Sequence, residues 1–169
     1  WDLATSIKTS ADYTASVAVA YSSDGTVYMR DMIRGRWEWP EAKAIIKATM
    51  LAEPGTQHGI ELALHGLAAV QEFSRDPDLV HIALTGIEVD RDKLARALPL
   101  SARAERGQVA LVRGAWNMPF IDVLCAFSGD GKTHDDQVDS ASGGLQMLSG
   151  SNAALIMQHY RQRAEAQHA

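Results

Sequence analysis

The sequence predicts an α/β domain, and three observations support this. Apolar and β-branched residues alternate over Tyr13–Tyr21 and Thr26–Ile33, and Asp24-Gly25 between them predicts a β-hairpin. Short apolar segments and helical patterns then alternate along the rest of the chain. The chain has 169 residues and 46% apolar composition, which is the size of one domain with a hydrophobic core. A mixed sheet with packed helices accounts for this order.

The remaining elements follow from apolar spacing and from the residues that begin helices. Trp1–Thr5 is expected to form a short strand before the hairpin. Pro40 opens a helix, since proline is favoured in a first turn, and Ile45, Ile46 and Met50 recur behind it at helical spacing. The other expected strands are Gly59–Ala63, Leu79–Thr85 and Gln108–Arg113, and the other expected helices are Gly66–Ser74, Asp92–Ala104, Met118–Phe127, Asp135–Leu148 and Asn152–Ala166.

Composition narrows the classes of function. The 21 acidic and 16 basic residues give a net charge of -5, which argues against a basic nucleic-acid coat protein. No apolar run approaches the roughly 18–20 residues that span a bilayer, so no membrane partner is expected. Cys125 is the single cysteine, which favours a reducing, cytoplasmic setting. Because the first residue is Trp1 and not Met, we expect a piece of a larger chain or a processed chain.

Carboxylates stand at three places where local structure can hold them. Asp2 lies on the first expected strand, and Glu61 lies within the apolar segment Gly59–Ala63. Asp135, Asp136 and Asp139 open a helix, and residues three or four apart share one helix face. Crowded carboxylates repel each other, and a hard divalent cation such as Mg²⁺ or Mn²⁺ reverses that repulsion.

Each of these residues also has a simpler interpretation. Acids in a first helical turn complement the helix dipole, and Thr133 is a candidate cap for that helix. Glu61 alone reads as an edge-strand residue, and Asp2 alone as a frayed terminal one. The functional interpretation therefore depends on the combination.

Five sequence strings together resemble the C-terminal nuclease domain of phage terminase large subunits. They run in order from Trp1 to about Leu148: WDLATSIKTSADYTASVAVAY, VYMRDMIRGRWEWPE, GIELALHG, DKLARA and AFSGDGKTHDDQVDSAS. The set is specific because a first-strand acid, a strand glutamate and an HDDQVD helix occur in this order. Two departures are the missing apolar lead into Asp2 and Leu62, which stands where the family has a further acid.

The resemblance implies an RNase H-like mixed sheet with helices on both faces. It implies an endonuclease that cuts double-stranded phage DNA in the infected bacterium's cytoplasm, after an N-terminal ATPase domain in the intact protein. The small terminase subunit and the portal protein are candidate partners. Two Mg²⁺ or Mn²⁺ ions would drive hydrolysis. By position, the catalytic metal ligands are Asp2 (as the bridge between the ions), Glu61, Asp136 and Asp139, with Asp135 as a further metal ligand and His134 as an outer ligand or a plain surface residue.

DNA contacts must come from local positive charge. The candidates are Lys93, which matches the family's DK-x-x-RA string, with Arg96, Arg91, Arg34 and Arg36. Ordinary solvated helix faces are the alternative. Trp37 and Trp39 are candidates for base stacking or for packing. No base-reading motif is visible, which predicts low sequence specificity.

Two other functions are compatible with the sequence, and one loop resembles a nucleotide-binding motif. A resolvase-type or transposase-type nuclease has the same fold and metals, and a non-catalytic docking module for DNA or packaging partners would need neither metal nor acids. Ala126–Thr133 resembles a relaxed phosphate-binding loop, but Asp135 and Asp136 would repel a phosphate there. We therefore expect no bound nucleotide.

The net charge fits an acidic site on a neutral body. Five of the 21 acids are the proposed site carboxylates, and without them the chain has 16 acids and 16 bases. Metal loading is then expected to raise DNA affinity sharply.

Overall fold

A β-hairpin forms the centre of the molecule. The structure is a computed structural model that describes residues 1–4, 13–89, 92–130 and 134–150. Strands β1 (Thr14–Tyr21) and β2 (Val27–Gly35) pair antiparallel, as the sequence predicts. The turn between them is held by the Asp24 carboxylate, which accepts from the Thr26 N–H at 2.9 Å, and by Gly25 at a φ of 86°. A positive φ of this kind favours glycine.

Short parallel strands extend the sheet on both sides. Strand β5 (Val109–Leu111) pairs with β2, and β3 (His58–Glu61) pairs with β4 (Leu84–Ile87). Trp1 and Asp2 join these two sets. Asp2 forms an antiparallel bridge with Ala15 of β1. On the other side the Trp1 nitrogen donates to the Gly59 carbonyl at 2.6 Å, and the Trp1 carbonyl accepts from the Glu61 N–H at 2.9 Å.

These bonds define a continuous order across the two sheets. The Trp1 bonds to Gly59 and Glu61 have the pattern of a parallel pair, with Trp1 opposite Ile60. The order is therefore β5, β2, β1, the Trp1–Asp2 segment, β3 and β4. It follows that Asp2 lies beside Glu61 on the neighbouring strand.

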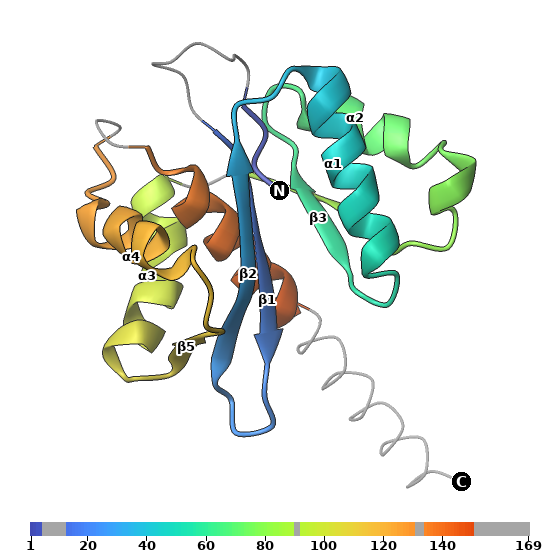
Figure 1. The fold of residues 1–169 in the computed structure, drawn as a ribbon. Coiled ribbons are helices and arrows are strands. Elements are labelled where there is room, and N and C mark those ends of the chain that lie inside the picture. The colour runs from blue at the N-terminus through green and yellow to red at the C-terminus, as the bar shows by residue number, and fades with distance from the viewer. Residues whose placement is uncertain (5–12, 90–91, 131–133, 151–169) are drawn as a thin grey trace, which may run out of the picture.

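Helices cover both faces of this sheet. Helices α1 (Trp39–Ala52) and α2 (Gly66–Phe73) lie beside β3, whereas α3 (Lys93–Glu105) and α4 (Asn117–Ala126) lie on the side of β5 (Figure 1). A last helix over residues 136–150 crosses behind β1 and β2 in this view. We call it the 136–150 helix.

Two apolar clusters hold the helices to the sheet. One joins α1, α2 and β3, and its buried members include Ile46, Ile60 and Phe73. The other joins β1 and β2 to α3, α4 and the 136–150 helix; its buried members are Val17, Val27, Met29, Leu100, Phe120, Ala141 and Leu145. Met32 of β2 packs on the second cluster and its neighbour Ile33 on the first. Since successive strand residues point to opposite faces, the two clusters lie on opposite sides of the sheet.

One expected strand is wrong. Residues Pro77–Leu79 form a 3₁₀ turn, and the strand begins only at Leu84. Asp76 explains the difference, because its carboxylate accepts from the Asp78 N–H at 3.0 Å and Pro77 begins the turn. The expected helix over Asn152–Ala166 lies outside the described residues. No helix in the described part of the chain is long and apolar enough to span a bilayer.

Candidate active site

Asp2 and Glu61 form the strand half of a carboxylate cluster. Their backbones lie side by side, because the Glu61 N–H donates to the carbonyl of Trp1, which directly precedes Asp2. Glu61 is only 5% exposed although it is charged. A buried carboxylate is rare unless it is paired, so this position calls for a partner.

The start of the 136–150 helix forms the other half. The Asp135 carbonyl accepts the first helical bond, from the Asp139 N–H at 2.9 Å. Asp135, Asp136 and Asp139 are 6%, 4% and 2% exposed, so these acids face the protein interior and not solvent. Val138, Ala141 and Leu145 are also buried, and they dock the helix on the sheet as the apolar stripe predicts.

Two hydrogen bonds tie this helix to the start of β1. The Tyr13 N–H donates to Asp136 Oδ2 at 3.0 Å, and the Val17 N–H donates to Ser140 Oγ at 2.8 Å. Both bonds connect residues that are far apart in sequence. They place the helix acids against the strand that carries the partner of Asp2.

Two cations from α3 enter the cluster. Arg96 donates through Nη1 to Glu61 Oε1 and through Nη2 to Asp139 Oδ1, both at 2.7 Å. Lys93 Nζ lies 2.7 Å from Asp135 Oδ1 and 3.1 Å from Asp139 Oδ2. The Arg96 side chain is 8% exposed and that of Lys93 is 46% exposed.

The protonation behaviour of the cluster reflects its crowding. Burial raises the pKa of Asp2 to about 8, and the charges of Glu61, Asp136 and Asp139 add to this effect. Burial also raises the pKa of Glu61 and that of Asp139, although the Arg96 guanidinium opposes both shifts. For Lys93, burial lowers the pKa, but the hydrogen bonds to Asp135 and Asp139 and the charges of these acids together outweigh it, so its pKa is raised. Perturbed groups of this kind gather at functional sites.

The donor set fits a hard divalent cation by its chemistry. Carboxylate oxygens are the ligands that Mg²⁺ and Mn²⁺ prefer, and burial raises the pKa values of Asp2, Glu61 and Asp139, so a bound cation would favour their ionised forms. Within the described ranges, however, no three acidic, histidine or cysteine side chains are arranged around one metal position. Part of the reason is visible, since the two α3 cations occupy oxygens of Glu61, Asp135 and Asp139.

Basic and aromatic side chains line the edge of the cluster. The guanidinium groups of Arg34 and Arg36 lie 4.5 and 3.9 Å from the centre of the Tyr13 ring. His134 packs edge-on against the same ring, with 5.3 Å between centroids. Arg91 lies outside the described residues. Thus Arg34, Arg36 and His134 all reach the segment whose backbone binds Asp136.

The two tryptophans take part in packing. Trp39 contacts Phe73 edge-on at 6.1 Å between ring centroids. The Trp37 ring covers Gly35 so closely that a Cβ there would lie 2.2 Å from it. Both tryptophans therefore pack against neighbouring residues of the domain.

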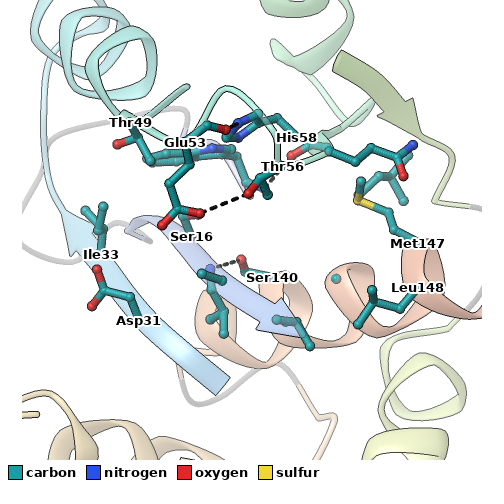
Figure 2. A pocket seen from close by; sticks show the side chains of 18 residues that line it. Ser16, Asp31, Ile33, Thr49, Glu53, Thr56, His58, Ser140, Met147 and Leu148 are labelled. Atoms are coloured by element: carbon teal, nitrogen blue, oxygen red, sulfur yellow. Dashed lines mark hydrogen bonds between the residues drawn. The ribbon is translucent and has the colours of Figure 1, made fainter. Parts of the chain in front are cut away.

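A separate hollow of about 160 Å³ lies between β1, β3, α1 and the 136–150 helix (Figure 2). The Val17 N–H and Ser140 Oγ meet on its wall, and Glu53 accepts there from the Thr56 hydroxyl at 3.1 Å. None of the five clustered acids lines it. Its lining includes Trp1 and residues of β1 and β3, so it is a gap between neighbouring strands. The acid side chains do not line this gap.

The sequence did not predict that the side chains of Lys93 and Arg96 would contact the acids of the cluster. The signal was present, since both share a helix face with Ala97 and Leu100, which are buried. Tyr13 was expected only as a strand residue, and no local pattern connects it to Asp136.

A comparison with protein families finds a match over residues 1–148 to the family described as the terminase RNase H-like domain. The match spans the sheet and the helix that carries Asp136 and Asp139. The mixed sheet with helices on both faces agrees with an RNase H-like fold, as the sequence resemblance implied. A comparison with curated proteins gives no match.

Proposed function

Since the chain belongs to the terminase RNase H-like domain family, we propose that it is a divalent-metal-dependent endonuclease that cuts double-stranded phage DNA during genome packaging. The observation that supports this most directly is the acid cluster. Asp2, Glu61 and the acids at the start of the 136–150 helix come from three separate parts of the chain, and burial, together with the charges of the other acids, raises the pKa of Asp2 to about 8.

Phosphodiester hydrolysis needs an activated water and a stabilised leaving oxygen. When bound, a pair of Mg²⁺ or Mn²⁺ ions supplies both effects. Asp2 is the proposed bridging ligand because it lies beside Glu61 and also interacts with Asp136 and Asp139. Asp135 is a further candidate ligand.

Phosphate contacts are assigned to side chains around the cluster. Arg34 and Arg36 are held over the Tyr13 ring, next to the segment that binds Asp136. The Lys93 side chain is 46% exposed and remains within reach of a DNA backbone. The more deeply buried Arg96 faces the acids, so its contribution to DNA binding is the weakest of the set.

The location and partners follow from the proposed reaction. Genome packaging would place the enzyme in the cytoplasm of an infected bacterium, with the small terminase subunit and the portal protein as candidate partners. We propose no role for a bound nucleotide in this part of the chain.

A plasmid-nicking assay with Mg²⁺, Mn²⁺ or EDTA tests the proposal. We expect cleavage with either metal, none with EDTA, and none for Asp2→Ala or Glu61→Ala. Asp122→Ala is the matched control, since Asp122 is an exposed acid on α4. Mn²⁺-dependent cleavage by the Asp2 or Glu61 variants would contradict the site assignment, provided that circular dichroism shows them folded.

The same assay separates the rival functions. Preference for a four-way junction over linear duplex would indicate a resolvase-type nuclease. DNA binding with no metal-dependent cleavage would indicate a docking module. If Arg34 and Arg36 contact phosphates, the double alanine variant should bind DNA more weakly and show a reduced salt slope in a fluorescence anisotropy titration.

A further inference from the structure

Arg96 is held between two of the proposed metal ligands. Its Nη1 and Nη2 each donate at 2.7 Å, one to Glu61 on β3 and the other to Asp139 on the 136–150 helix. Its side chain is 8% exposed, and its Nε is buried without a hydrogen-bond partner among the described residues. The guanidinium thus joins the strand half of the cluster to the helix half, but one of its donors is unsatisfied.

Arg96 also lines a hollow that none of the five clustered acids lines. This hollow of about 520 Å³ lies beside Arg96, between α3 and the 136–150 helix, and Glu88 and Ser142 also line it. The Ser142 hydroxyl is buried and, like Arg96 Nε, has no hydrogen-bond partner in the part of the chain that the structure describes. Burying a polar group without a hydrogen-bond partner costs free energy, so such groups are rare in folded proteins. Two of them on one hollow therefore indicate hydrogen-bonding capacity that the observed arrangement does not use.

The observed position of the guanidinium and a position in this hollow differ in what they leave for a cation. In the observed position, oxygens of Glu61 and Asp139 bind the guanidinium. A divalent cation shared by those carboxylates would compete for the same oxygens, and its charge would repel Arg96. In the other position, the hydroxyl of Ser142 and the carboxylate of Glu88 offer acceptors for the same donors.

We propose that Arg96 is a positioning residue with two seats, one on Glu61 and Asp139 and one on Glu88 and Ser142, and that metal binding requires it to move to the second. This inference rests on the proposed function, because it takes Glu61 and Asp139 as metal ligands. Arg96 then neutralises the buried acids before metal arrives and raises the metal concentration needed to fill the site. The same feature accounts for the lack of a formed metal position among the described side chains.

The test is a Mn²⁺ titration of the whole chain, with free Mn²⁺ followed by electron paramagnetic resonance. Arg96→Gln removes the competing charge, so Mn²⁺ should bind at least about 10-fold more tightly, which corresponds to about 1.4 kcal/mol. Glu88→Gln weakens the second seat, so Mn²⁺ should bind several-fold more weakly although Glu88 is no proposed ligand. Arg103→Gln is the matched control on α3, because Arg103 contacts Tyr21 and the Gly25 carbonyl and should leave Mn²⁺ binding unchanged.

The outcomes separate this inference from the proposed function. If wild type binds no Mn²⁺ at all, the proposed function fails. If wild type binds Mn²⁺ and Glu88→Gln binds it equally well, the two-seat inference fails, even where loss of the buried pair prevents Arg96→Gln from folding. An independent measurement uses wild type alone, since the ¹⁵Nε signal of Arg96 should shift on addition of Mg²⁺ while that of Arg103 stays constant. An unchanged Arg96 signal at saturating Mg²⁺ would also overturn the inference.

Discussion

Asp2 should make the metal-free protein less stable as the pH rises. Its pKa is about 8 in the folded chain, because burial and the charges of Glu61, Asp136 and Asp139 disfavour its ionised form. An unfolded chain ionises an aspartate near pH 3.9. Between these values the folded state binds more protons than the unfolded state, so the free energy of unfolding falls with increasing pH.

The size of the effect follows from the same shift. Each pKa unit corresponds to about 1.4 kcal/mol, so a single group would lower the free energy of unfolding by up to about 4 kcal/mol between pH 5 and pH 8. The raised pKa values of Glu61 and Asp139, which share protonation with Asp2, act in the same direction, whereas burial lowers the pKa of the Trp1 amino group and so opposes the fall. A loss of about 2–4 kcal/mol is a large part of the stability of a domain of this size.

Urea unfolding in EDTA at pH 5 and pH 8 measures this loss. Asp2→Asn removes the charge, so the variant should be more stable than wild type at pH 8, and its pH dependence should be flatter. Asp122→Asn, at an exposed position on α4, should behave as wild type does. Mn²⁺ favours ionised carboxylates and should stabilise wild type more at pH 8 than at pH 5. A wild-type stability that rises from pH 5 to pH 8 in EDTA, or an equal slope in Asp2→Asn, would refute the reasoning.

Two further predictions concern how the fold supports the site. A Cβ at Gly66 would lie 1.6 Å from the Glu61 carbonyl oxygen, whereas one at Gly55 meets nothing within 4 Å. Gly66→Ala should therefore lower the melting temperature and the nicking rate, while Gly55→Ala should change neither, and an active, stable Gly66→Ala would contradict the close approach. Phe120 is 0% exposed in the cluster that supports the 136–150 helix, so Phe120→Ala should cost about 3–5 kcal/mol in urea unfolding. Leu64→Ala, at a position that is 79% exposed, should stay within about 0.5 kcal/mol of wild type.

Local patterns predicted most of the fold because each of its elements carries its own signal. The Asp24-Gly25 turn defines the hairpin, and Pro40 lies in the first turn of α1. The strand at Leu84–Ile87 was misplaced because the apolar residues before it pack in a 3₁₀ turn that Asp76 and Pro77 hold. Burial alone does not distinguish a short strand from a packed turn, since Leu79 and Ile82 are as buried as strand residues.

The acid cluster could be predicted only in part, and there is a physical reason why the rest could not. The spacing of Asp136 and Asp139 predicts a shared helix face, and the resemblance adds Asp2 and Glu61. Which cations those acids meet depends on how α3 packs, which is a tertiary property. Lys93 and Arg96 were expected to contact DNA as part of a locally basic segment, and Lys93 also because it matches the family's DK-x-x-RA string, but Arg96 lies on the helix face of the buried Ala97 and Leu100 and meets the acids.

The packing of α3 changes the interpretation of the net charge. The sequence suggested five site acids on a neutral body, but Lys93 and Arg96 belong to the site as well. Outside these seven residues the chain has 16 acids and 14 bases, so the remaining surface is slightly acidic. Under the proposed function, DNA would then be attracted by local groups such as Arg34 and Arg36, or by charge that the site gains. When a metal ion displaces Arg96 from Glu61 and Asp139, the site gains the charge of the ion. It also keeps its two basic residues, Lys93 and Arg96. Since metal adds the same charge with or without Arg96, the expected rise of DNA affinity with metal should be retained in Arg96→Gln, which a salt-matched anisotropy titration on uncleaved DNA with Ca²⁺ can measure.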